Sequence, residues 1–162
     1  TTKEVIRGNY IIQTSCMKHE ISAGAIIYYE DDEKRTYLLL KSKKGHWDFT
    51  KGHVEGEETL VEAARREIME EAGFAKKDLE FVVGFHREIT YSFSSRAVEG
   101  EDVSKAVTYF LANVRREEVA LSEEHLEYGW FSYRDALGVL KFKNARSLLI
   151  AAEQFLNKNT PA

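Results

Sequence analysis

Seven glutamates gather in one short stretch, EGEETLVEAARREIMEE at residues 55–71, in which the only cations are two arginines. The local charge is therefore −5, whereas the whole chain of 162 residues carries −4. On a helix, Glu67, Glu70 and Glu71 are related as i, i+3 and i+4 and project from one face. They would lie near the negative end of the helix dipole, where anions are disfavoured. This arrangement calls for a compensating cation.

Two interpretations of the glutamates stay open at this point. They form a solvated acidic face, in which Arg66 pairs with a glutamate four residues away, or they bind a divalent cation. Mg²⁺ and Mn²⁺ prefer carboxylate and water oxygens and commonly act beside substrate phosphates. The preceding stretch, residues 41–53, holds four lysines against Asp48. Such a stretch is typical of a solvated loop, but beside a cation site it suits a phosphate-containing ligand.

Hydrophobic periodicity predicts the elements that must position these residues. Strands alternate with helices, which predicts a layered α/β or α+β domain. We expect a hairpin of 21–29 and 36–41, a helix over 59–72 that stops at Gly73, strands at 79–92, 106–114 and 127–132, and a final helix over 144–157. The loops at 42–50 and 93–104 are candidates for the functional rim because they are rich in Lys, Ser and Gly.

Composition places the chain among ordinary globular proteins. The length suits one domain over residues 1–162, and 43% hydrophobic residues argue against disorder. No apolar run approaches the length of a membrane span, and no basic excess suggests binding to nucleic acid or to a membrane surface. Cys16 alone cannot form an internal disulfide, and no export signal opens the chain, so we expect a cytoplasmic setting.

The segment GHVEGEETLVEAARREIMEEAGF, residues 52–74, resembles the box of the Nudix hydrolase family. That box reads Gly, five residues, Glu, seven residues, Arg-Glu, an aliphatic residue, any residue, Glu-Glu, any residue, Gly and a bulky apolar residue. Every spacing is kept here. The matching positions are Gly52, Glu58, Arg66, Glu67, Ile68, Glu70, Glu71, Gly73 and Phe74.

The resemblance implies the Nudix fold, an α/β/α sandwich with a mixed sheet between helices. It also implies hydrolysis of a nucleoside diphosphate linked to another moiety, with Mg²⁺ or Mn²⁺ and more than one ion per site. Glu58 and Arg66 would form a structural pair that fixes the loop onto the helix. The implied metal ligands are Glu67, Glu70, Glu71, Glu124 and the carbonyl of Lys51.

Outside the box, the chain is similar to the asymmetric diadenosine tetraphosphate hydrolases, a group within that family. The similarity rests on HWDFTKGHVE, GFHREITY, KAVTYFLA, EHLEYGW and the aromatic residue in KFKNA, and it covers about residues 20–158. It assigns His46, Lys51 and Lys105 to the polyphosphate, and it implies that Tyr91 and Tyr128 sandwich an adenine.

Two departures from the group bear on the substrate. Phe49-Thr50 and Gly56-Glu57 stand where animal members have Pro-Pro and Pro-Gly, with the loop length unchanged. Phe49 and the loop 93–104 are therefore expected to influence which second nucleotide fits. Residues 1–18 form an N-terminal extension with no counterpart in the group.

The leading hypothesis is hydrolysis of diadenosine tetraphosphate to ATP and AMP by attack of water on phosphorus. Glu67, Glu70 or Glu71 would accept the proton, and the sequence leaves open which. Alternatives are removal of pyrophosphate from the 5′ end of RNA, a diphosphoinositol polyphosphate substrate, and a non-catalytic nucleotide-binding module. The expected partner is a small nucleotide, and the sequence predicts no oligomeric state.

Overall fold

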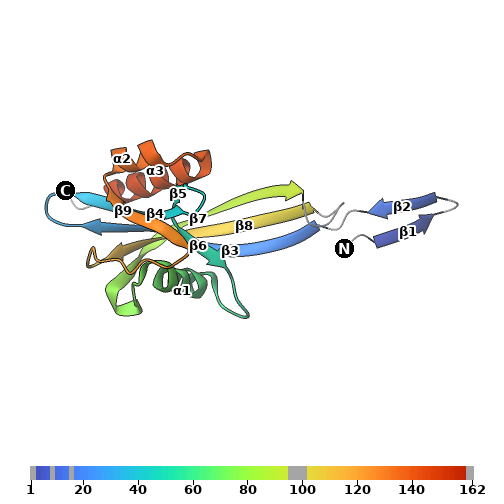
Figure 1. The fold of residues 1–162 in the computed structure, drawn as a ribbon, viewed down its shortest axis with the longest axis horizontal. Helices are drawn as coiled ribbons and strands as arrows, with labels where there is room; N and C mark the ends of the chain where they lie inside the picture. The colour runs from blue at the N-terminus through green and yellow to red at the C-terminus, as the bar shows by residue number, and fades with distance from the viewer. Residues whose placement is uncertain (1–2, 8–9, 15–16, 95–101, 160–162) are drawn as a thin grey trace.

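The computed structural model describes residues 3–7, 10–14, 17–94 and 102–159. Within these residues a mixed sheet of seven strands lies between helices (Figure 1), as the sequence predicted. The strands are β3 (Met17–Glu30), β4 (Arg35–Ser42), β5 (Trp47–Asp48), β6 (Thr50–His53), β7 (Leu79–Ser94), β8 (Asp102–Val114) and β9 (His125–Phe131). The helices are α1 (Leu60–Ala72), α2 (Tyr133–Val139), α3 (Lys143–Lys158) and the 3₁₀ helix η1 (Lys76–Asp78).

Strand β3 organises the sheet because it pairs along both of its edges. On one edge it runs parallel to β8, which in turn pairs antiparallel with β7. On the other edge it pairs with β4 near its C-terminal end and with β6 near its middle. Strand β4 also pairs with β5 and β9. The short strand β6 therefore lies where the sheet divides into two branches.

Alternate residues of β4 show how the two faces of the sheet are covered. Leu38 and Leu40 pack in a cluster with Ile68 of α1, whereas Leu39 packs in a second cluster with Leu148 of α3. Side chains of a strand point alternately to opposite faces, so an unbroken apolar run is the pattern of a strand buried on both. Helix α1 covers one face, and α2 and α3 cover the other (Figure 1).

Both ends of α1 are fixed by local chemistry. Thr59 caps the N-terminus by accepting a hydrogen bond from the Glu62 amide, and the Glu62 side chain accepts one from the Thr59 amide. Gly73 ends the helix with φ 81°, a left-handed conformation that favours glycine. The last turn contains no basic residue. The glutamates near this end therefore gain no compensation from a cation in the last turn.

The structure differs from the predicted elements in three of the places where they can be compared. Residues 42–50 were expected to be a loop, but they contain β5 and the start of β6; β5 spans only two residues, too few to leave a periodic signal. Helix α2 was not predicted, and its seven residues bury only Ala136. The predicted loop 93–104 overlaps the ends of β7 and β8, and its residues 95–101 lie outside the described residues.

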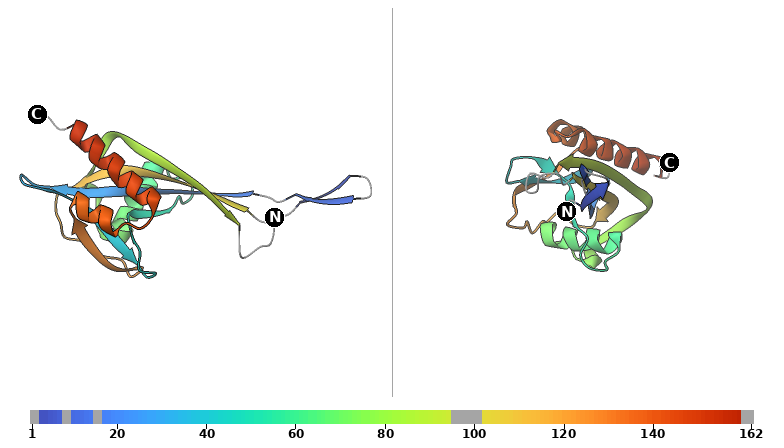
Figure 2. Two further views of the ribbon diagram at one scale, coloured as in Figure 1. Left: turned by 90° about the horizontal axis from the view of Figure 1, so that it is seen from above. Right: turned by 90° about the vertical axis from the view of Figure 1, so that its right-hand side faces the viewer.

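The N-terminal extension contains a hairpin of β1 (Lys3–Arg7) and β2 (Tyr10–Thr14). These two strands form a separate sheet beyond the ends of the long strands β3, β7 and β8 (Figure 2). No helix in the described part of the chain is long and apolar enough to cross a membrane.

Candidate active site

An acidic cavity lies against the last turns of α1. Three glutamates of α1 line one side of it, and the segment 122–124 lines the other. The Ser122 amide donates a hydrogen bond to the Glu71 carbonyl (N···O 3.2 Å), which fixes this segment to the end of the helix. The cavity thereby collects five carboxylates, those of Glu67, Glu70, Glu71, Glu123 and Glu124.

Arg66 binds the glutamates and the preceding loop together. Its guanidinium donates to both carboxylate oxygens of Glu58 (2.9 and 3.1 Å) and to the His53 carbonyl (2.8 Å). Its Nη1 also contacts Glu67 (2.8 Å) and Glu70 (3.1 Å). The hydrogen bonds to Arg66 lower the pKa of Glu58, and Glu58 in turn raises the pKa of Arg66. The loop is thus fixed onto the helix by the pair that the resemblance implied.

Glu71 is the most deeply placed of the α1 carboxylates. It is 8% exposed, and its Oε2 accepts a hydrogen bond from the Lys51 amide (3.0 Å). Burial, followed by the charge of Glu67, raises the pKa of Glu71 to about 8. The nearby His125, with Nε2 4.0 Å from Glu71 Oε1, has its pKa lowered by burial, so it supplies no strong positive charge. The buried carboxylate therefore lacks a strong cationic partner within the described residues.

The donors around this cavity fit a divalent cation. They are carboxylate oxygens, the ligands that hard ions such as Mg²⁺ and Mn²⁺ prefer. In the described part of the chain no three His, Cys, Asp or Glu side chains are grouped closely enough to hold a metal ion. Arg66 and the Lys51 amide engage three of the carboxylates. Gly52 allows the loop to approach: a Cβ there would lie 2.0 Å from Glu67 Oε1.

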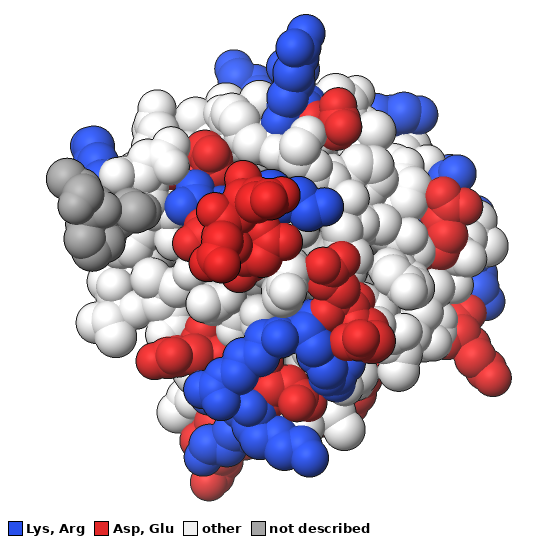
Figure 3. All heavy atoms as spheres, turned by 90° about the vertical axis from the view of Figure 1, so that its left-hand side faces the viewer, with Lys and Arg blue, Asp and Glu red and all other residues white. Residues whose placement is uncertain are grey.

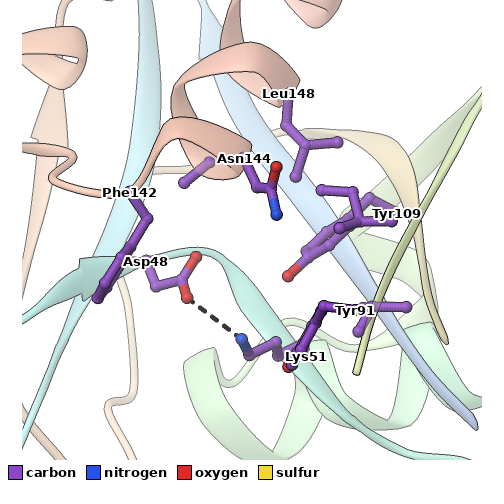
Figure 4. A pocket seen from close by; sticks show the side chains of 10 residues that line it. Asp48, Lys51, Tyr91, Tyr109, Phe142, Asn144 and Leu148 are labelled. Atoms are coloured by element: carbon purple, nitrogen blue, oxygen red, sulfur yellow. Dashed lines mark hydrogen bonds and ion pairs between the residues drawn. The ribbon is translucent and has the colours of Figure 1, made fainter. Parts of the chain in front are cut away.

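Lys51 connects the acidic cavity to a second cavity across β6. In the antiparallel pairing of β3 and β6, Thr50 lies opposite Ala25 and Gly52 opposite Ala23, two residues that pack on the α1 side. The intervening Lys51 side chain therefore points to the α3 side. There its Nζ lies 3.4 Å from Asp48 Oδ2 (Figure 4). The backbone of Lys51 serves one cavity and its side chain the other.

The second cavity is mainly aromatic and apolar, with a volume of about 330 Å³. Tyr91 and Phe142 stand on different sides of it, 39% and 51% exposed (Figure 4). Its remaining lining residues are Asp48, Lys51, Ile89, Val107, Tyr109, Asn144, Ala145 and Leu148. Aromatic faces of this kind bind flat rings by stacking, whatever the identity of the ring.

Of the other predicted substrate residues, Lys105 and His46 lie near this cavity. Lys105 is directly opposite Tyr91 in the pairing of β7 and β8, so both side chains are on the same face. The His46 ring packs against the edge of Phe142, with the ring centroids 5.2 Å apart. These residues are therefore placed to reach a ligand that extends beyond the cavity.

Tyr128 lies elsewhere. It pairs with Leu40, whose side chain packs on the α1 side, whereas Tyr91 is on the α3 side. Tyr128 is not one of the residues that line the aromatic cavity. The structure therefore does not bring the two tyrosines of the predicted sandwich together there. Phe49, expected to influence which second nucleotide fits, is 3% exposed and packs against Tyr109, which lines the aromatic cavity.

Sequence reasoning assigned no role to Phe142, Asn144, Asp48 or Tyr109, which all line the aromatic cavity. Phe142 was noted only as the aromatic residue of KFKNA. One sequence signal could have identified Phe142: it is an aromatic residue directly before an amphipathic helix, and the start of such a helix packs near the sheet. Asp48 and Tyr109 carry no local signal, since they meet only after the strands pair.

The fold and the acidic cavity together define a protein class, and comparison with known proteins identifies it. The NUDIX domain family profile matches residues 18–152, and the chain belongs to this family of hydrolases. Nudix hydrolases generally use divalent metal ions.

Within the family, the chain is similar to asymmetrical bis(5'-nucleosyl)-tetraphosphatases. It is 35% identical to that of Mus musculus over 136 residues, which cover 82% of this chain and 87% of the mouse protein. It is 33% identical to that of Caenorhabditis elegans over 138 residues, covering 83% and 95%. The crystal structure of a C. elegans Ap4A hydrolase binary complex superimposes with a TM-score of 0.75 at 31% identity, covering 86% of this chain and 98% of that one.

Proposed function

We propose that this protein hydrolyses dinucleoside polyphosphates, and diadenosine tetraphosphate to ATP and AMP in particular. The observation that carries the proposal is the placement of the two cavities on opposite sides of Lys51. An acidic cavity suits metal-bound phosphates, and an aromatic cavity suits a nucleobase. A ligand that contains both phosphates and a nucleobase would extend from one cavity to the other past Lys51. The names of the relatives agree with such a ligand.

The aromatic cavity would bind one nucleoside. Tyr91 and Phe142 would stack on its base, and stacking on an aromatic side chain contributes about 1–3 kcal/mol per base. Lys51 and Lys105 would contact the phosphates through charge-assisted hydrogen bonds, with His46 at the edge of the cavity. In this arrangement Phe142 takes the stacking role that the sequence assigned to Tyr128.

The acidic cavity would carry the reaction. Glu67, Glu70, Glu71, Glu124 and the Lys51 carbonyl would hold Mg²⁺ or Mn²⁺, more than one ion per site. When bound, such ions lower the pKa of water and neutralise charge on the phosphates. One of Glu67, Glu70 and Glu71 accepts the proton of the attacking water. Arg66, itself held by Glu58, keeps Glu67 and Glu70 in place, and the Lys51 amide holds Glu71.

The charge of the surface supports a small substrate over RNA. On the face in Figure 3, Lys and Arg side chains gather in patches that alternate with Asp and Glu, and this face presents no continuous basic surface. Binding of a nucleic-acid chain relies on many phosphate contacts along such a surface. Two confined cavities beside one lysine instead suit a ligand of nucleotide size.

The test is product analysis of a panel of dinucleoside polyphosphates hydrolysed in ¹⁸O-labelled water with Mg²⁺ present. ATP and AMP from diadenosine tetraphosphate, with the label in one product, support the proposal. Two molecules of ADP would reject the asymmetric cleavage. Absence of turnover across the panel would favour a binding module, and release of pyrophosphate from 5′-triphosphorylated RNA in a parallel assay would favour that alternative.

A further inference from the structure

The aromatic cavity holds a base by features that do not distinguish one base from another. Its walls are the rings of Tyr91 and Phe142, and Val107 and Leu148 are among its apolar lining residues. Stacking and apolar contact are tolerant of base identity, because every base has a flat aromatic face. Selectivity has to come from polar groups that reach the edge of the ring.

Apart from the stacking residue Tyr91, four residues with polar side chains line the cavity, and three of them are poorly suited to this task (Figure 4). The Asp48 carboxylate is engaged by Lys51 Nζ (3.4 Å) and by the Phe49 amide (2.8 Å). Lys51 is already paired with Asp48, and in the proposed function its side chain contacts the phosphates. Tyr109 offers one hydroxyl from a side chain that is 4% exposed.

Asn144 is the fourth group. Its amide points into the cavity in Figure 4, and it makes no hydrogen bond within the part of the chain that the structure describes. The side chain presents an acceptor oxygen next to a donor nitrogen. It is the one lining residue that offers both in a plane.

The backbone of Asn144 is held by the packing of its neighbours in α3. It lies in the first turn of α3, two residues after the stacking ring of Phe142, and the next residue, Ala145, is 6% exposed. Leu148, one turn further on, is 4% exposed in the same core cluster. The buried face of α3 therefore holds the backbone of Asn144 in place beside the cavity, and the exposed side chain of Asn144 stays accessible to a ligand.

We propose that Asn144 is the specificity-determining residue of this cavity and selects adenine over guanine, an inference that rests on the proposed function for its substrate class. Adenine presents a donor (N6–H) beside an acceptor (N7), which an asparagine amide matches with two hydrogen bonds. Guanine presents two acceptors (O6 and N7) on the same edge. The amide nitrogen can satisfy only one of them, and the amide oxygen then faces a second oxygen or nitrogen acceptor.

Calorimetric titration of the metal-free protein with ADP and with GDP tests the proposal without turnover. The unaltered protein should bind ADP more tightly. Asn144→Ala should bind ADP roughly 10-fold more weakly, because it loses one bidentate contact. The ratio of the ADP affinity to the GDP affinity should fall by the same factor. Asn144→Asp, which replaces the donor by an acceptor, should weaken the binding of both nucleotides and should not favour GDP, because guanine presents only acceptors (O6 and N7) on this edge. Gln154→Ala removes an exposed amide from the same helix and should leave both affinities unchanged.

The outcomes separate this inference from the proposed function. An ADP-to-GDP affinity ratio that is the same in Asn144→Ala as in the unaltered protein overturns the role of Asn144, as does a preference for GDP in the unaltered protein. Either result can occur in a protein that cleaves dinucleoside tetraphosphates. Conversely, loss of the preference in Asn144→Ala would stand even if the product analysis showed no asymmetric cleavage.

Discussion

The acidic and the aromatic cavity share Lys51 but are assembled in different ways. Three of the five carboxylates of the acidic cavity come from two turns of one helix, within residues 67–71. The aromatic cavity draws on β5, β6, β7, β8, α3 and the residue before α3, over residues 48–148. The first depends on local helix geometry and the second on correct pairing of distant strands. The carboxylates of the proposed reaction are thus mostly specified within one helix, whereas the residues of the proposed base site meet only in the tertiary structure.

The largest loss of activity should result from neutralising a single carboxylate of the acidic cavity. Glu71→Gln keeps the shape and an acceptor for the Lys51 amide but removes the charge, and we expect turnover to fall by roughly two to four orders of magnitude. Glu67→Gln should behave in the same way. Steady-state kinetics with Mg²⁺, together with circular dichroism to verify the fold, measure this effect. Retained activity in both variants would refute the assignment of the site.

The acidic cavity should also make the metal-free protein sensitive to pH. The pKa of Glu71 is about 8 in the folded protein against 4.5 for an ordinary glutamate, so the folded state binds the extra proton between these values. Stability should therefore fall as pH rises from 4.5 to 8, on the order of 4 kcal/mol in total. Urea unfolding in EDTA across this range measures the slope.

In Glu71→Gln this slope should become shallower, and the variant should be more stable than the unaltered protein at pH 8. Mg²⁺ should stabilise the unaltered protein there, because an ion that binds only the folded state shifts the equilibrium toward it. A metal-free protein whose stability does not change between pH 4.5 and 8 would contradict the buried, cation-deficient state of Glu71.

A smaller effect on the same cavity is expected from Gly52→Ala. The added Cβ would lie 2.0 Å from Glu67 Oε1, and the flexible carboxylate can move away while the backbone stays. We expect activity to fall by roughly 10- to 100-fold, as misplacement of a catalytic group does. The melting temperature should change little. Gly45→Ala is a control with open space around its Cβ, although its positive φ of 85° makes some loss of stability expected there.

The smallest effects should come from the aromatic cavity. Tyr91→Ala and Phe142→Ala each remove one stacking surface, and we expect KM for diadenosine tetraphosphate to rise by roughly 10-fold with kcat little changed. Tyr128→Ala is the matched comparison, since Tyr128 does not line this cavity. A larger rise in KM for Tyr128→Ala than for Phe142→Ala would restore the sandwich that the sequence predicted.

The contrast between the cavities also explains what could be predicted from the sequence. The spacing of Glu67, Glu70 and Glu71 specifies one helix face, so the helix was predicted at 59–72, one residue longer than α1, with the three glutamates on one side of it. The strands were predicted because both faces of the sheet bury apolar residues, which gives the strands continuous apolar runs in the sequence. The stacking partner that we propose for Tyr91 was not predicted, because Phe142 reaches the cavity only through the packing of α3. An aromatic residue directly before an amphipathic helix indicates packing near the sheet, but it does not indicate which cavity the ring lines.

Along β6, the side chains at positions 50, 51 and 52 point alternately to the two faces of the sheet. This restricts the insertions and deletions that the strand can tolerate. Removing or inserting one residue within β6 would turn every later side chain to the other face of the sheet. Lys51 would leave the aromatic cavity, and a side chain would enter the space that Gly52 leaves beside Glu67. Both sites would be lost in one step. In evolution or in engineering, the length of β6 should therefore stay fixed.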